Sequence, residues 1–270
     1  MTLTAEARFV LTVLPEAARM LHEFEQRREP IRQETKDRGE LVTVADRAIN
    51  SLLVDAVHSA FAHDAICAEE GSGHDNPGAQ RRWFIDPLDG TRSFVAGRPG
   101  YSIMLGLVVE GTPTLGVVYD ACARRTLIAQ RSSGVFEFND NRLCELRGSA
   151  SQRRLMWNPF TRPDAAKPLS RALGLAGFDL CESVGLRACA MARGEAMVFG
   201  SGPCSPKLWD SAAAAVFVAE LGGQYTDFDL RPLDYRRAEV IHERGAVASV
   251  GLNHETVVRA VREALETVRA

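Results

Sequence analysis

Residues 83–94 limit the possible folds of this chain more than any other stretch. Trp83 to Ile85 are apolar and bulky and follow two arginines, a pattern that predicts a short buried strand. Asp86 and Asp89 follow this strand directly, with a proline between them. Because Pro87 has a fixed φ angle and no N–H group, we expect the central strand to end there. The sequence therefore predicts two carboxylates at the mouth of a turn.

The next two residues complete the turn. Gly90 allows a tight turn and a close approach of a ligand to the backbone, and Thr91 is suited to open a helix. Two carboxylates ahead of a helix N-terminus can hold divalent cations and a phosphate together. Asp-Pro and Asp-Gly are also ordinary turn signals, so a turn without chemistry is the alternative. Haloacid-dehalogenase-type phosphatases are excluded, since Pro87 stands where their nucleophilic aspartate would be.

Length and composition are typical of soluble globular proteins. The chain has 270 residues, enough for one large domain or two packed halves, with 46% hydrophobic and 25% charged residues. A net charge of -3 suggests no general affinity for nucleic-acid polymers. The longest apolar run, Ala212 to Ala219, is too short to span a membrane. Six cysteines without a Cys-x-x-Cys pair predict buried free thiols in a reducing, cytoplasmic setting.

Further acidic residues stand where strands end or helices start. Asp46 has capping-box spacing to Thr43, so a helix-start residue without a catalytic role is its stronger interpretation when it is taken alone. Glu69 and Glu70 follow a short predicted strand, and a solvated loop is the stronger interpretation of this pair when it is taken alone. Asp210 lies in the first turn of a predicted buried helix, where a carboxylate can simply cap the helix. Each of these residues thus has a purely structural explanation.

The hydrophobic pattern assigns the rest of the chain to helices and strands. A helix over 3–28 is expected to be kinked or restarted at Pro15. A meander of strands follows the aspartates, and the polar stretch 141–152 is the expected passage between two halves. The second half alternates strands and helices. The predicted strands are 65–68, 101–110, 114–119, 125–130, 134–138, 153–157, 178–180, 196–199, 224–228 and 246–250, and the later helices are 164–173, 184–193, 208–221 and 254–268.

In their order along the chain, the acidic elements resemble the inositol monophosphatase family of magnesium-dependent, lithium-sensitive phosphatases. The family pattern is an Asp at a helix start, a Glu-Glu pair, Asp-Pro-(Ile/Leu)-Asp-Gly-(Ser/Thr) and a distant Trp-Asp-x-Ala-Ala-Gly. The resemblance extends from about Lys36 to the C-terminal helix. It implies an α/β fold, a layered α-β-α-β-α sandwich similar to that of fructose-bisphosphatases. It also implies a site between an N-terminal half, 1–145, and a C-terminal half, 146–270, in one compact unit, and a homodimer.

The resemblance implies roles for individual residues, with two or three Mg²⁺ ions per site as the cofactor. The metal ligands would be Glu69, Asp86, the carbonyl group of Leu88, Asp89 and Asp210. Thr91, paired with Asp46, would orient the attacking water, and Glu70 would support that water or a third metal ion. Backbone N–H groups of Gly90 and Thr91 would hold the phosphate. Further contacts to the substrate would come from Ser183, Arg187 and Lys207, and Lys36 would point into the site.

The implied reaction is hydrolysis of a phosphomonoester by a metal-activated water, which makes the chain a phosphoric monoester hydrolase. Bound Mg²⁺ neutralises the charge of the phosphate and lowers the pKa of a bound water. The substrate would be a small phosphorylated metabolite such as inositol monophosphate or a similar sugar or polyol phosphate. A 3′(2′),5′-bisphosphate nucleotidase, a histidinol phosphatase and a non-catalytic binding protein are the alternatives. Two departures bear on this choice: Ala214 replaces a family glycine, and residues 182–187 differ from the family's substrate-recognition stretch.

Overall fold

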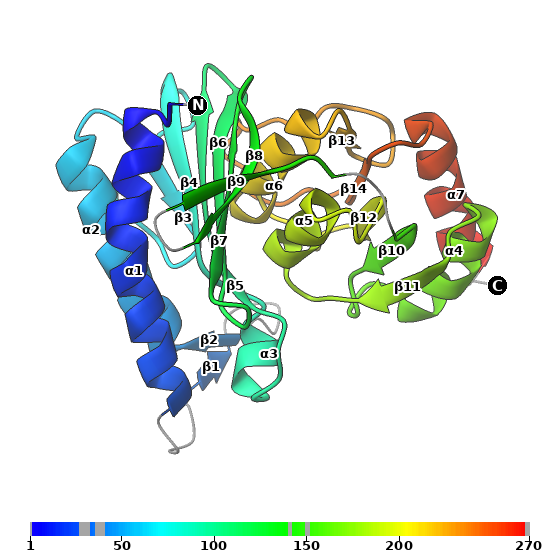
Figure 1. Ribbon diagram of the computed structural model, residues 1–270, viewed down its shortest axis with the longest axis horizontal. Coiled ribbons are helices and arrows are strands. Elements are labelled where there is room, and N and C mark those ends of the chain that lie inside the picture. The colour runs from blue at the N-terminus through cyan, green and yellow to red at the C-terminus, as the bar shows by residue number, and fades with distance from the viewer. Residues whose placement is uncertain (1, 27–32, 36–40, 140–141, 149–151, 268–270) are drawn as a thin grey trace.

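The fold consists of two main sheets and the helices that cover and separate them (Figure 1). The computed structural model describes the chain apart from residues 1, 27–32, 36–40, 140–141, 149–151 and 268–270. The helices are α1 (Ala5–Gln26), α2 (Val44–Ala60), α3 (Thr91–Val95), α4 (Ala166–Ala172), α5 (Val184–Ala192), α6 (Leu208–Glu220) and α7 (His254–Thr267). Helices α1 and α2 cover the first sheet, α5 and α6 lie between the sheets, and α4 and α7 cover the second sheet. These layers confirm the predicted α-β-α-β-α sandwich.

The first sheet contains seven strands in the order β3-β4-β5-β6-β7-β8-β9, with β3 and β4 parallel and the other neighbours antiparallel. The strands are β3 (Ala65–Ala68), β4 (Arg81–Asp89), β5 (Ser102–Val109), β6 (Thr112–Asp120), β7 (Arg125–Gln130), β8 (Gly134–Asn139) and β9 (Arg142–Leu146). Because β9 lies within the polar stretch 141–152, the prediction that this whole stretch connects the halves is wrong. An edge strand pairs on only one side and tolerates polar side chains, which explains its loop-like composition.

Strand β4 continues through Pro87, where the sequence predicted its end. Asp86 pairs with Met104 of β5 and Asp89 pairs with Ser102, and the register shifts between these two pairs. The irregularity accommodates a residue without an N–H group, because bulged residues leave the regular hydrogen-bond ladder. Both aspartates are therefore held in a buried strand, with only 2% and 7% of their surfaces exposed.

Helix α1 also continues through a proline. The prediction that the helix restarts at Pro15 is wrong, because α1 is unbroken from Ala5 to Gln26. Val10, Leu14 and Leu21 are buried on one face of the helix and belong to the same apolar cluster as the first sheet. Their packing offsets the hydrogen bond that a proline cannot donate.

A small two-stranded sheet precedes α2 and was not predicted. It pairs β1 (Gln33–Thr35) with β2 (Leu41–Thr43) in antiparallel fashion. Strands of three residues are too short to give an alternation pattern in the sequence. Lys36, predicted to point into the site, lies outside the described residues.

The second sheet contains five strands in the order β11-β10-β12-β14-β13. They are β10 (Arg154–Trp157), β11 (Gly177–Leu180), β12 (Val198–Ser201), β13 (Gln224–Thr226) and β14 (Ala246–Ser249). Strand β10 is parallel to both β11 and β12, so the carboxyl ends of these three strands lie at one edge of the sheet. In α/β sheets this edge is the usual place for a ligand. The division into halves at residues 145 and 146 stays a prediction.

Helix α6 packs on the first sheet at two glycines. A Cβ atom at Gly116 would lie 2.4 Å from the carbonyl oxygen of Ala213, and one at Gly106 would lie 2.8 Å from its backbone nitrogen. The alanine-rich helix thus approaches the backbone of β5 and β6 directly. Ala214 is fully buried in an apolar cluster with Phe217, where it contributes to the packing of α6. It is not among the described residues that line the cavity presented below.

All six cysteines are free thiols. Cys67 and Cys189 are buried and Cys181 is partly buried, in line with the prediction of buried thiols. That prediction is wrong for the three exposed cysteines, Cys122, Cys144 and Cys204. They lie in loops or on an edge strand, and no local pattern around them indicated exposure.

Candidate functional site

A cavity of about 370 Å³ opens where the end of β4 meets α6 and the carboxyl ends of β10, β11 and β12. The structure brings most of the predicted site residues to its wall. These are Glu69, Asp86, Leu88, Asp89, Gly90, Thr91, Arg187, Lys207 and Asp210. Asp46, Glu70 and Ser183 are not among the described residues that line it, but Asp46 is hydrogen-bonded to Thr91 and Ser183 to Asp89, which do line it. The cavity therefore unites acidic elements that are up to about 140 residues apart in the sequence.

Two aspartates at the end of β4 form the buried part of the acidic wall. Asp86 Oδ1 accepts a hydrogen bond from the backbone N–H of Leu88 (3.0 Å). Burial, followed by the charges of Glu69, Asp89 and Asp210, raises the pKa of Asp86 well above its usual range. Burial, followed by the charge of Asp210, raises the pKa of Asp89 to about 7. The wall therefore holds ionised carboxylates only at a cost in free energy that a cation would offset.

Residues at the start of α5 hold Asp89. The Ser183 hydroxyl and the Gly185 N–H both donate to Asp89 Oδ2, at 2.6 and 2.8 Å. Ser183 is also the N-cap of α5 and accepts from the N–H of Leu186 (3.0 Å). Since Ser183 is fully buried and its hydroxyl is bonded to Asp89, its placement favours a role in positioning that carboxylate over contact with a substrate.

The turn after Asp89 requires a glycine. Gly90 has a φ angle of 96°, in the left-handed region, and a Cβ atom there would lie 2.4 Å from the carbonyl oxygen of Gly100. The turn places Thr91 at the start of α3. The Thr91 hydroxyl lies 3.2 Å from Asp46 Oδ1 and 2.9 Å from the carbonyl oxygen of Leu88.

Asp46 belongs to a helix cap and to the site at once. The capping box with Thr43 is present, because the Thr43 backbone N–H donates to Asp46 Oδ2 (2.8 Å) and the Thr43 hydroxyl caps α2. The other carboxylate oxygen of Asp46, Oδ1, accepts a hydrogen bond from the Thr91 hydroxyl. Burial raises the pKa of Asp46, hydrogen bonds from Thr43 oppose this, and the charge of Glu70 adds to it. Asp46 is thus hydrogen-bonded to Thr91 and close enough to Glu70 for that charge to act on it.

The start of α6 supplies the far side of the wall. Asp210 Oδ2 accepts a hydrogen bond from the backbone N–H of Lys207 (2.8 Å), which closes the first turn of the helix. The side chain of Lys207 extends over the ring of Trp209, with Nζ 5.4 Å from the ring centre. Asp210 therefore caps α6 and lines the cavity, so the two explanations that the sequence offered are compatible.

Arg187 lies on the wall but is fully buried. Its guanidinium donates to the carbonyl oxygens of Glu182, Ser183 and Gly200 and to the hydroxyl of Ser201. These bonds use four of its five N–H groups. The arrangement favours a structural role for Arg187, which holds the start of α5 against the end of β12.

The donor set suits a hard divalent cation. Carboxylate oxygens from separate segments and the Leu88 carbonyl are the ligand types that Mg²⁺ prefers. In the part of the chain that the structure describes, no three His, Cys, Asp or Glu side chains already converge in ligating geometry. By their chemistry and their shared cavity wall, Glu69, Asp86, Asp89 and Asp210 still suit Mg²⁺.

Several wall residues were missed by the sequence analysis. Asn158, Glu182 and Ser201 stand at or directly after the carboxyl ends of β10, β11 and β12. Glu182 accepts hydrogen bonds from the N–H (3.0 Å) and hydroxyl (2.9 Å) of Ser93, which ties α3 to the second sheet. The signal was available, because polar residues that follow parallel strands gather at one edge of a sheet.

His242 braces the start of α6 from the loop before β14. Its Nε2 lies 2.8 Å from the hydroxyl of Ser211, and its Nδ1 lies 3.2 Å from Nη2 of Arg237. Because a guanidinium can only donate, Nδ1 is the acceptor and Nε2 carries the proton. Burial, followed by the charge of Arg237, lowers the pKa of His242 to about 4. The folded protein therefore holds His242 neutral.

Because His242 stays neutral in the folded protein, we expect its contribution to the free energy of unfolding to fall by about 2 kcal/mol between pH 7 and pH 5. The unfolded chain, with a histidine pKa of about 6.5, binds a proton in this range, whereas the folded chain does not, so acid favours unfolding. Urea unfolding of wild type and His242→Gln at both pH values measures this difference. The carboxylates titrate in both proteins and cancel in the comparison, so identical pH dependence would contradict the prediction.

Comparison with known proteins by sequence supports a family assignment. The sequence model of the inositol monophosphatase family matches residues 6–266. A fructose-1,6-bisphosphatase/inositol-1-monophosphatase of Thermotoga maritima is 31% identical over 236 residues, which cover 85% of both chains. A histidinol-phosphatase of Chlorobaculum parvum is 42% identical over 95 residues, 35% of this chain and 36% of its own.

Solved structures share the fold. An inositol monophosphatase (IMPase) of Thermotoga maritima superposes with a TM-score of 0.80 at 28% identity, covering 98% of this chain and all of its own. An IMPase/NADP phosphatase complexed with Mg²⁺ and phosphate has a TM-score of 0.77 at 24% identity, covering 94% of this chain and 93% of its own. With an acidic cavity of this design, a family match over nearly the whole length and relatives of the same fold, this chain belongs to the inositol monophosphatase family of phosphoric monoester hydrolases.

Proposed function

We propose that the chain is a Mg²⁺-dependent phosphomonoesterase that hydrolyses a small phosphorylated metabolite. The observation that carries this proposal is that carboxylates from separate segments line one cavity. Glu69 follows β3, Asp86 and Asp89 lie on β4, and Asp210 lies on α6. Burial, followed by repulsion from neighbouring carboxylates, raises the pKa of Asp86 and of Asp89, and a divalent cation would offset both effects. The related IMPase/NADP phosphatase that was solved with Mg²⁺ and phosphate supports the same ligands for this chain.

The residues of the chain would hold, orient and deprotonate the reactants. Bound Mg²⁺, held by Glu69, Asp86, Asp89, Asp210 and the Leu88 carbonyl, would supply charge neutralisation and a water of lowered pKa. Of the two acceptors near the Thr91 hydroxyl, an ionised Asp46 is the stronger. Donation to Asp46 leaves the Thr91 oxygen free to accept a hydrogen bond from the attacking water.

Three further contributions complete the proposed mechanism. The charge of Glu70 acts on Asp46, and Glu70 would support the same water or a third, weaker metal ion. The backbone N–H groups of Gly90 and Thr91, at the turn before α3, would hold the phosphate. Lys207, on the wall, would add a positive charge for the substrate.

For the substrate, we propose inositol monophosphate or a similar sugar or polyol phosphate, which a cavity of about 370 Å³ can hold. One observation favours a second candidate. Phe160 lies on the wall with 53% of its surface exposed, and the guanidinium of Arg92 lies over its ring at 4.3 Å. Flat surfaces of this kind suit a base or an imidazole ring. A bisphosphate nucleotide or histidinol phosphate is therefore the alternative, and one relative is named a histidinol-phosphatase.

The experiment is a phosphate-release assay with inositol 1-phosphate, histidinol phosphate and 3′-phosphoadenosine 5′-phosphate. We expect hydrolysis of at least one substrate with Mg²⁺ and its loss in EDTA. Mg²⁺ should also raise Tm, because a cation that binds only the folded carboxylates stabilises the fold. Li⁺ at millimolar concentration, but not Na⁺, should inhibit if the second metal position is as in the family. Full activity in EDTA would contradict the proposal.

Several further statements stay predictions. These are the homodimer, the cytoplasmic location, the number of metal ions, and the absence of nucleic-acid and membrane partners. For the last of these, the helices that the structure describes include none that is long and apolar enough to cross a bilayer. Size measurement by light scattering would test the dimer.

A further inference from the structure

We propose that Arg82 is a positioning residue that fixes the loop after β3 relative to the segment that braces α6. This inference rests on the proposed function, because it concerns the spacing of the metal-binding carboxylates. Arg82 lies on β4, four residues before Asp86, and is only 2% exposed. Since side chains alternate along a strand, Arg82, Phe84 and Asp86 face the same side, and Phe84 packs with residues of α6.

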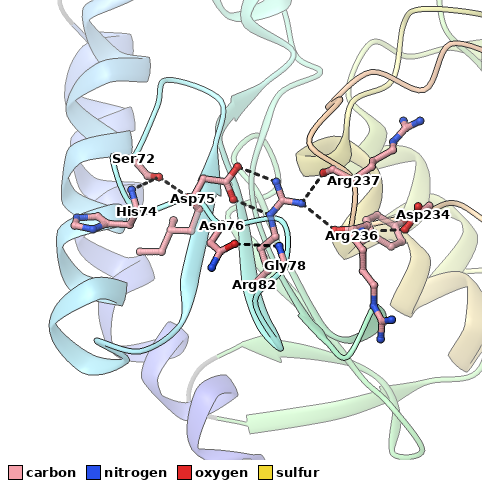
Figure 2. Close-up of polar contacts among 11 residues, drawn as sticks. Ser72, His74, Asp75, Asn76, Gly78, Arg82, Asp234, Arg236 and Arg237 are labelled. Atoms are coloured by element: carbon pink, nitrogen blue, oxygen red, sulfur yellow. Dashed lines mark hydrogen bonds and ion pairs between the residues drawn. The ribbon is translucent and has the colours of Figure 1, made fainter.

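One side of the Arg82 guanidinium binds the loop between β3 and β4. This loop begins with Glu69 and Glu70 and has no helix or strand of its own. Asp75, further along the loop, accepts hydrogen bonds from Nε and Nη2 of Arg82, both at 2.8 Å (Figure 2). Such a two-point pair fixes direction as well as distance. The turns between these glutamates and Asp75 contain Gly71, which has a φ angle of 84° and open space around it.

The other side of the guanidinium binds the C-terminal part of the chain. Its Nη1 donates to the carbonyl oxygens of Tyr235 (2.9 Å) and Arg237 (3.1 Å), which are 153 and 155 residues away in sequence (Figure 2). Carbonyl groups of a loop have few other ways to be held at a fixed point. A lysine could not make the same set of bonds, because it lacks the planar fork of donors.

The segment 235–242 then reaches the start of α6. The N–H of Leu208 donates to the carbonyl oxygen of Val240, and the N–H of His242 donates to that of Pro206, both at 2.9 Å. The ring of His242 contacts Ser211, the residue after Asp210. Arg82 therefore connects the loop that starts with Glu69 to the segment that supports Asp210. Its loss should alter the spacing between these carboxylates, and hence metal affinity, more than the reaction at full metal occupancy.

The test uses Asp75→Asn. The side chain of Asp75 is 35% exposed, and its replacement leaves the buried arginine with its carbonyl partners. Asp75→Glu restores the carboxylate and is the conservative variant. Asp179→Asn is the matched control, because it removes a similar two-point pair with Arg154 (2.6 and 2.8 Å) on the second sheet.

We expect Asp75→Asn to raise the Mg²⁺ concentration for half-maximal thermal stabilisation by about tenfold, with kcat at saturating Mg²⁺ nearly unchanged. In the metal-free protein, amide hydrogen exchange at residues 70–79 should become faster. Asp179→Asn should match wild type in both measurements, and Asp75→Glu should recover part of the affinity. An unchanged Mg²⁺ requirement or unchanged exchange in Asp75→Asn would overturn the inference. A wild type without Mg²⁺ stabilisation or phosphatase activity would instead overturn the proposed function, and this inference with it.

Discussion

Asp89→Asn should lower kcat by about 10³-fold or more while the protein remains folded. Stabilisation of charge by a bound metal is worth several kcal/mol, and each 1.4 kcal/mol is about a tenfold change in rate. Asparagine keeps one carbonyl oxygen, which can still accept from the Ser183 hydroxyl and the Gly185 N–H, so the contact with α5 survives. What is lost is the negative charge opposite Asp210. Phosphate release at saturating substrate and Mg²⁺ measures the effect.

A matched variant separates this loss from damage to the fold. Asp120 is also a buried carboxylate of the first sheet, but it pairs with Arg193 at 3.2 Å instead of lining the cavity. Asp120→Asn should lower Tm and leave kcat close to wild type. An Asp89→Asn protein with wild-type kcat would remove Asp89 from the metal site. In addition, Mg²⁺ should no longer raise the Tm of Asp89→Asn as it does for wild type.

Asp46→Asn and Thr91→Val should each lower kcat by about 10²-fold or more, with small changes in Tm. An ionised Asp46 accepts the Thr91 proton, whereas an amide accepts it less well and can turn the hydrogen bond around. Valine has the size of threonine but cannot accept a hydrogen bond from water. Steady-state kinetics at saturating Mg²⁺, together with thermal melts, measure both properties.

The double variant is the sharper test of this pair. If Asp46 and Thr91 act as one unit, Asp46→Asn/Thr91→Val should be scarcely slower than either single variant. The cap on α2 gives a different expectation, because asparagine can also accept the Thr43 N–H that Asp46 now receives. Near-normal kcat combined with a lowered Tm in Asp46→Asn would return this residue to a purely structural role.

Most helices and strands and the acidic motifs were predictable because their signals are local, whereas the layered fold and the shared site were implied by the resemblance to a family. Asp86, Asp89 and Asp210 stand beside short motifs at a strand end or a helix start, and helices and strands around them follow simple periodicities. These signals failed where packing overrides the local preference. Pro87 is accommodated by a bulge in β4, and Pro15 is carried within α1 by the apolar face of that helix.

The supporting residues of the site could not be predicted in the same way. Ser183 and Arg187 were expected to touch substrate, but their polar atoms are bonded to Asp89 and to backbone groups inside the protein. Nothing in a sequence separates a buried arginine from one that faces a ligand, since both depend on contacts between distant segments. For the same reason, the bonds from Arg82 to Asp75 and to Tyr235 had no sequence signal.

Helix α6 meets the first sheet through main-chain atoms at Gly106 and Gly116, without side chains between them. Asp210 lies on this helix. Its distance from Asp86 is therefore fixed by the close packing of α6 on β5 and β6, which leaves little room for movement. A hinge opening that moved the second sheet away from α6 would leave this seam intact, and with it the spacing of the two carboxylates. Any opening of the cavity for substrate entry or product release would then shift the second sheet or the loops around the cavity, and not the two carboxylates relative to each other.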